Sequence, residues 1–187
     1  RSWIRRTNYF HDSDTQYMRF LVRENARVLD IGCGPGDLLA ALKPSHGVGV
    51  DISPGMVDSA CESYPELTFV KGDIESPEVI KGLGDEPFDF IILSDTIGVL
   101  DDIQRTLESL LGLCHRDTRI IIAYYNYVWS PVLKLLELLR LKMPQVELNS
   151  LPPADITHIM GLAGFGLVKQ EWRTVLPIRL FGLGSMI

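Results

Sequence analysis

Cysteine is scarce in this chain, where Cys33, Cys61 and Cys114 stand far apart among 187 residues. The sequence contains no CxxC pair and no cluster of Cys and His at the spacing of metal ligands. We therefore expect neither a disulfide framework nor a metal site. This use of cysteine favours a reducing compartment, which predicts a cytoplasmic protein.

Long apolar runs and excess positive charge are missing as well. No stretch approaches the roughly 18 apolar residues of a membrane span, and no apolar run follows the charged N-terminus. The 18 Lys and Arg stand against 24 Asp and Glu, so the net charge is −6. A negative chain repels a phosphate backbone. The composition thus argues against stable membrane insertion and against nucleic-acid binding.

The residues that are present predict one α/β domain. From residue 27 onward, short apolar runs alternate with helical patterns, which predicts a doubly wound, mostly parallel sheet with helices on both faces. The expected strands are Arg27–Ile31, Gly47–Asp51, Thr68–Lys71, Phe88–Ser94, Arg119–Tyr125 and Gly166–Arg173. The expected helices, two of them opened by a Ser-Pro pair, are Asp12–Arg23, Asp37–Leu42, Pro54–Glu62, Asp102–Cys114, Pro131–Lys142 and Pro153–Leu162.

A glycine-rich turn follows the first expected strand, with Gly32, Gly34 and Gly36 at alternate positions. A dinucleotide fingerprint needs its third glycine where this chain has Asp37, and no Gly-Lys-Ser/Thr follows to make a P-loop. Asp30 and Asp37 flank the turn, and two carboxylates would repel a pyrophosphate. The turn therefore favours a ligand that carries positive charge.

Acidic residues also follow the next two expected strands. Asp51 comes 21 residues after Asp30, where a carboxylate can accept both hydroxyl protons of a ribose. The alternative is an N-cap for the next helix, a role that Ser53 would fill. Asp73 could accept a hydrogen bond from an adenine amine, with Ile74 against the ring, or could form an ordinary Asx turn.

Taken in order, the segments VLDIGCGPG, GVDISPGMV, KGDIES and FDFIILSDTIGVLDD resemble the motifs of class I S-adenosylmethionine-dependent methyltransferases. The resemblance covers about residues 27–173. It implies S-adenosylmethionine as the cofactor and S-adenosylhomocysteine as the product. Carried onto this chain, it assigns Asp30, Gly32, Gly34 and Gly36 to the methionine end, Asp51 to the ribose with Ile52 beside it, Asp73 and Ile74 to the adenine, and Ser94 and Asp95 to the methyl-transfer site.

Methyl transfer is an in-line displacement that depends mainly on alignment, so the family has no universal catalytic residue. The candidates for a base or an orienting group are His11, Tyr125 and Tyr127, each with a solvated, capping or packing role as its alternative. His46 and His115 precede expected strands, so we expect both on the surface away from the site.

We expect the acceptor to be a small molecule. The chain as a whole also resembles methyltransferase domains that some bacteria encode beside, or fused to, sugar-transferring enzymes. That likeness implies a bacterial protein, a glycan or envelope precursor as acceptor, and a fused or neighbouring domain beyond the termini.

We expect a single methyltransferase domain over residues 1–187, made of an N-terminal helical cap (1–25), a Rossmann-like core (26–175) and the start of a truncated segment (176–187). The family usually adds a final antiparallel strand, and only 14 residues follow Arg173. We therefore expect that strand to be missing from this chain, or else the terminal segment to pair in an unusual way. Two other functions stay open: a nicotinamide-dependent oxidoreductase, and a methyltransferase-like binding domain that transfers nothing.

Overall fold

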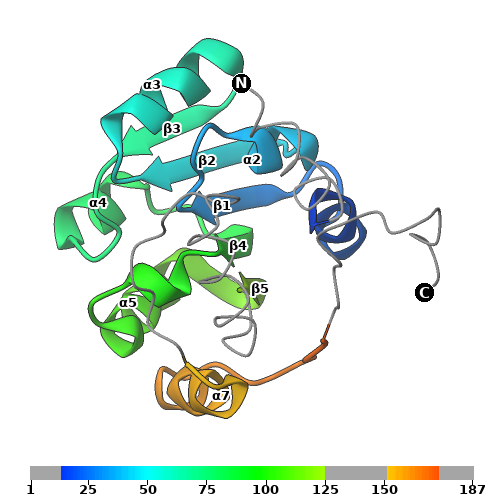
Figure 1. Cartoon of the computed structure of the whole chain (residues 1–187), viewed down its shortest axis with the longest axis vertical. Coiled ribbons are helices and arrows are strands. Elements are labelled where there is room, and N and C mark those ends of the chain that lie inside the picture. Colours follow the sequence, from blue (N-terminus) through cyan, green and yellow to red (C-terminus); the bar gives the residue numbers. More distant parts are fainter. Residues whose placement is uncertain (1–13, 125–150, 173–187) are drawn as a thin grey trace, which may run out of the picture.

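A computed structural model of the chain describes residues 14–124 and 151–172 (Figure 1). A helix at residues 14–21 comes first. The strands are β1 (Arg27–Ile31), β2 (His46–Asp51), β3 (Thr68–Lys71), β4 (Phe88–Ser94) and β5 (Cys114–Ala123). The helices are α2 (Asp37–Ala41), α3 (Pro54–Ser63), α4 (Pro77–Gly82), α5 (Ile103–Leu110) and α7 (Pro153–Leu162), with 3₁₀ turns η1 (Ile97–Val99) and η2 (Leu111–Leu113).

The five strands form one parallel sheet in the order β3-β2-β1-β4-β5. The central strand β1 places Ile31 beside Val50 of β2 and beside Leu93 of β4. The strand order reverses between β1 and β4, and ligands of such sheets bind at the carboxyl ends of the strands near this reversal. The prediction of a doubly wound parallel sheet is confirmed.

Apolar side chains form one cluster on each face of the sheet. Because successive residues of a strand point to opposite faces, β1 contributes Leu29 and Ile31 to one cluster and Val28 to the other. Leu107 of α5 packs in the first cluster and Leu39 of α2 in the second. Figure 1 shows the corresponding helices on either side of the strands.

The strand expected at Gly166–Arg173 is wrong for residues 166–172, which form no strand, and Arg173 lies outside the described residues. A strand needs a neighbour for its backbone hydrogen bonds, and in the described part of the sheet β5 is the last strand on its side. Leu167 and Val168, which suggested a buried strand, are 60% and 73% exposed.

The short helix α4 was missed, although Ser76-Pro77 at its start is the same Ser-Pro signal that marked other helices. α4 has only six residues and no fully buried side chain, so it carries little of the apolar periodicity that identifies a helix. The helix expected at Pro131–Lys142 lies outside the described residues. Within the described ranges, no helix has the length and apolar character needed to cross a membrane.

Candidate functional site

The glycine turn joins β1 to α2 at the carboxyl edge of the sheet. All three of its glycines have positive φ, namely 76° at Gly32, 53° at Gly34 and 85° at Gly36. The N–H of Gly32 donates to the carbonyl of Val50 at 2.8 Å, so the turn stays attached to β2 after β1 has ended. A Cβ at Gly34 would meet no atom within 4 Å, which leaves open space beside that part of the backbone.

Asp30 is the buried acid of the site. It lies in β1 just before the turn and is 2% exposed, and its Oδ2 has no hydrogen-bond partner among the described residues. Burial, together with the nearby carboxylate of Asp51, raises the pKa of Asp30 to about 7. A buried carboxyl oxygen without a partner favours an added hydrogen-bond donor, and a cationic donor above all.

Asp51 connects the glycine turn to the start of α3. Its Oδ2 accepts from the N–H of Gly34 and its Oδ1 from the N–H of Ser53, both at 2.8 Å. Ser53 stands at the N-cap position but makes no side-chain cap bond, so the expectation that Ser53 fills this role was wrong in that respect. Each carboxylate oxygen has a second lone pair, so Asp51 retains acceptors for a diol.

The two residues expected at the adenine, Asp73 and Ile74, follow β3 and differ in exposure. Asp73 is exposed, and its Oδ1 accepts from the N–H of Glu75 at 2.9 Å, which is the Asx turn given as the alternative. Ile74 is 5% exposed and packs in the core, so its side chain has little surface left for an adenine ring. Ile52 is 70% exposed next to Asp51 and offers the free apolar surface that Ile74 lacks.

The tip of β4 brings Ser94 and Asp95 to the same edge. Asp95 has a φ of 57°, and its N–H donates to the carbonyl of Ala123 at 2.8 Å. Thr96, which the sequence analysis did not single out, places its hydroxyl 2.8 Å from the carbonyl oxygen of Ile31 and 3.0 Å from that of Ser94. Thr96 thereby joins the β4 tip to the strand that carries the glycine turn.

Glu75 was also missed, and it holds the loop after η1. Its carboxylate accepts from the N–H of Asp101 at 2.9 Å, from the N–H of Asp102 at 2.7 Å and from the hydroxyl of Thr106 at 3.2 Å. Partial burial alone would raise the pKa of Glu75, but these hydrogen bonds outweigh it and lower the pKa. Glu75 therefore fixes the β3 and β4 loops relative to each other.

Two of the described histidines, His46 and His115, lie away from this edge. Nε2 of His115 lies 3.5 Å from Asp89, near the amino end of β4, and the ring of His46 stacks on Phe88. Both histidines therefore lie at the opposite end of the sheet, as expected. His11, Tyr125 and Tyr127 lie outside the described residues, so their roles stay predictions. No group of three potential metal ligands occurs in residues 14–124 and 151–172.

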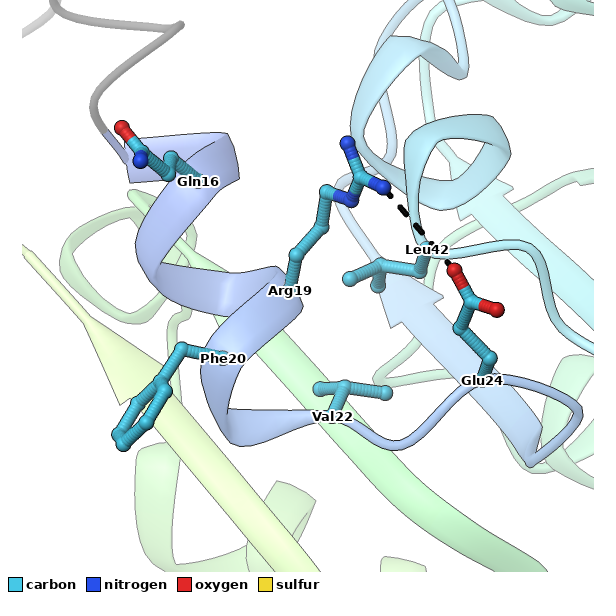
Figure 2. Close-up of a pocket in the computed structure, with 6 residues that line it drawn as sticks. All are labelled: Gln16, Arg19, Phe20, Val22, Glu24 and Leu42. Carbon is cyan, nitrogen blue, oxygen red and sulfur yellow. Dashed lines mark ion pairs between the residues drawn. The ribbon is translucent and has the colours of Figure 1, made fainter.

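Two hollows occur in the described surface, and one of them lies beside the loop that Glu75 holds. One, of about 390 Å³, lies between the N-terminal helix and Leu42. Figure 2 shows Arg19 and Glu24 facing each other there, 3.9 Å apart, while Phe20 points away. The other, of about 360 Å³, lies between the start of α5 and α7, with Leu151 and Ile159 in its wall. Neither is lined by Asp30, Asp51 or the turn.

Comparison with known proteins identifies the class. A family model described as a methyltransferase domain matches residues 4–170. Two solved structures share the fold, each with a TM-score of 0.70. One is a S-adenosylmethionine-dependent methyltransferase, a possible histamine N-methyltransferase, from Thermotoga maritima (24% identity, 89% of this chain and 75% of that one). The other is magnesium protoporphyrin IX methyltransferase from Synechocystis PCC 6803 with bound S-adenosylhomocysteine (22% identity, 91% of this chain and 80% of that one).

Curated relatives match shorter segments. The highly reducing polyketide synthase pspA of Penicillium soppii is 32% identical over 114 residues, which are 54% of this chain and 4% of that protein. Trans-aconitate 2-methyltransferase of Methylobacterium nodulans is 44% identical over 55 residues, 27% of this chain and 21% of the relative. The chain thus spans less than a quarter of the length of either protein.

The chain belongs to the methyltransferase domain family. It is a class I methyltransferase domain, and S-adenosylmethionine is the cofactor of this class.

Proposed function

We propose that this domain transfers the methyl group of S-adenosylmethionine to a small-molecule acceptor. The observation that carries the proposal is the position of the Asp51 carboxylate, bonded to the N–H groups of Gly34 and Ser53 and still able to accept from a diol. Around it, the described residues fit the cofactor. The unpaired oxygen of Asp30 suits an ammonium group, the space beside Gly34 suits a close ligand, and the exposed Ile52 suits a base.

We assign roles to this chain's residues from the resemblance together with that geometry. When bound, the cofactor supplies an electrophilic methyl group on a positively charged sulfur. Asp51 would orient the ribose, and the backbone of Gly32, Gly34 and Gly36 would admit the methionine end near Asp30. Ser94 and Asp95 would face the acceptor. Asp73 is exposed enough to reach an adenine amine, whereas the buried side chain of Ile74 leaves little apolar surface for the ring.

The two alternatives receive less support. A dinucleotide-binding turn needs a glycine where this chain has Asp37, and a pyrophosphate there would meet the carboxylate of Asp37. That arrangement opposes a nicotinamide-dependent oxidoreductase. A non-catalytic binding domain has no observation in its favour.

Calorimetric titration tests the cofactor. We expect S-adenosylhomocysteine to bind and NAD to produce no heat of binding. Binding of NAD alone would contradict the proposal. Transfer of a labelled methyl group from S-adenosylmethionine to any acceptor would exclude the non-catalytic alternative.

For the acceptor, the resemblance to domains linked to sugar-transferring enzymes favours a glycan or envelope precursor. A relative named for trans-aconitate makes a small carboxylate the second class to test. A screen with labelled methyl donor should therefore compare nucleotide sugars and glycan precursors with di- and tricarboxylates. Label found only in the carboxylates would contradict the glycan acceptor and leave methyl transfer itself intact.

A further inference from the structure

In the part of the chain that the structure describes, no cation near Asp30 keeps its carboxyl group ionised. Among the described residues, no Lys, Arg or His forms an ion pair with Asp30, and its Oδ2 has no hydrogen-bond partner. Its Cα neighbours across the sheet are Gly49 in β2 and Ile92 in β4, neither of which carries charge. An ionised carboxylate in such a place is unfavourable unless a partner arrives.

None of the titratable groups described around Asp30 offers it a positive charge. The Asp51 carboxylate on β2 is near enough to disfavour a second negative charge. Cys33 in the turn is 6% exposed, and burial followed by the charges of Asp30 and Asp51 raises the pKa of its thiol to about 12. Cys33 therefore stays neutral and offers no compensating charge. Asp37 on α2 is exposed and accepts from the hydroxyl of Tyr64.

We propose that cofactor binding to this domain is coupled to the release of a proton from Asp30. In the free protein the carboxyl group is largely protonated at mildly acidic pH. When the cationic amino-acid end of the cofactor reaches the glycine turn, the proton leaves the carboxyl oxygen for the buffer, and the carboxylate pairs with the ammonium group. No other bond forms or breaks. This inference rests on the proposed function, because it concerns the same site.

The sign of the effect follows from the ionised fraction. With a pKa of about 7 in the free protein, most Asp30 is ionised at about pH 7.5 and only about a tenth at about pH 6. Only the ionised form offers a carboxylate to the ammonium, so the apparent affinity falls with that fraction. The dissociation constant of S-adenosylhomocysteine should therefore be about tenfold higher at about pH 6 than at about pH 7.5.

The test is calorimetric titration of the full chain with S-adenosylhomocysteine between about pH 5.5 and 7.5, below the range in which the ligand's own α-amino group titrates. At about pH 6.5, repetition in buffers of different ionisation enthalpy counts protons, and we expect roughly 0.7 proton released per ligand. This count needs no variant. Adenosine, which lacks the amino-acid end, should bind without proton release.

Asp30→Asn tests the assignment to this residue. Asn mimics the protonated acid, so the variant should show a flat pH profile with an affinity near that of the unmodified protein at low pH. Asp58→Asn removes an exposed carboxylate from α3. In this variant the dissociation constant of S-adenosylhomocysteine should change with pH as it does in the unmodified protein. Binding with no proton release, or an Asp30→Asn variant that keeps the slope, would overturn the inference and leave the proposed function standing. Absence of S-adenosylhomocysteine binding at every pH would overturn both.

Discussion

A Cβ atom at Gly32 would lie 2.1 Å from Oγ1 of Thr96. The Thr96 hydroxyl occupies that space because it lies 2.8 Å from the carbonyl of Ile31 and 3.0 Å from that of Ser94. The pairing of β1 with β4 ends at Ile31 and Leu93. The Thr96 hydroxyl therefore links the two segments just beyond their last paired residues. Gly32 is thus required by its positive φ and by the approach of a neighbouring strand.

Gly32→Ala should therefore damage both the fold and the site. The added Cβ must displace Thr96 and adopt a left-handed conformation, and we expect a loss of about 2 to 4 kcal/mol in the free energy of unfolding. Urea denaturation measures this loss, and calorimetry should show weaker binding of S-adenosylhomocysteine.

Two other glycines serve as controls. At Gly34 only the positive φ opposes alanine, since the space around its Cβ position is open, so Gly34→Ala should cost about 1 kcal/mol. Gly161 lies in the last turn of α7 with open space and no positive φ, so Gly161→Ala should stabilise the protein by about 0.5 kcal/mol. If Gly32→Ala and Gly34→Ala lowered the free energy of unfolding equally, Thr96 would move aside without any loss of stability.

The sequence predicted the parts of this site that depend on neighbours along the chain. Apolar runs located the first five strands, and the spacing of Asp30, Asp51 and Asp73 identified the tips of β1, β2 and β3. Thr96 and Glu75 escaped because their partners lie far along the chain, 65 residues away for Ile31 and 26 to 31 residues away for the groups bound by Glu75. Such pairs exist only once the strand order is known.

Burial and strand pairing explain the remaining differences between the prediction from sequence and the structure. Ile74 and Ile52 each follow an acidic residue at a strand tip, yet one is buried and the other is 70% exposed. Local sequence does not distinguish them. Residues 166–172 have the composition of a strand, but composition supplies no neighbour with which to pair.

Asp51→Ala should weaken binding of S-adenosylhomocysteine by about 1.5 to 3 kcal/mol, the range for hydrogen bonds to a charged group. The same change frees the N–H groups of Gly34 and Ser53, so part of the loss could be structural. A comparison of adenosine with 2′-deoxyadenosine separates the two causes. A ribose contact predicts that the preference for adenosine disappears in the variant, whereas a structural effect weakens both ligands equally. An unchanged affinity would remove Asp51 from the ribose.

The three cysteines should react at different rates with iodoacetamide at mildly alkaline pH. The thiolate is the reactive form, and Cys33 is buried with its pKa raised to about 12. Cys61 is exposed and should be modified first. Cys114 is half-buried, and burial raises the pKa of its thiol, so it should react more slowly than Cys61. Peptide mapping by mass spectrometry measures the order.

In denaturant all three cysteines should react at similar rates, which controls for the peptides themselves. Modification of Cys33 in the native protein as fast as that of Cys61 would show that the glycine turn opens readily. That result would contradict the fixed turn on which the site depends.

Glu75→Gln should reduce stability by about 1 kcal/mol at neutral pH, because an amide oxygen accepts the N–H groups of Asp101 and Asp102 less strongly than a carboxylate does. The pKa of Glu75 is lower in the folded protein than its ordinary value of 4.5, so its contribution is complete above that value. The contribution is lost as the pH falls through the folded pKa. The difference in unfolding free energy between the unmodified protein and the variant should therefore shrink from about pH 5 to about pH 3.

Urea denaturation at several pH values measures this difference. Glu78→Gln is the matched control, because Glu78 lies on α4 and its carboxylate interacts only with groups of the same helix start and of α4 itself, such as the hydroxyl of Ser76, among the contacts of the described residues. Its effect should be smaller, since Glu78 connects no separate loops. A pH-independent difference for Glu75→Gln would mean that the shape of the side chain, and not its charge, holds the loops of β3 and β4 together.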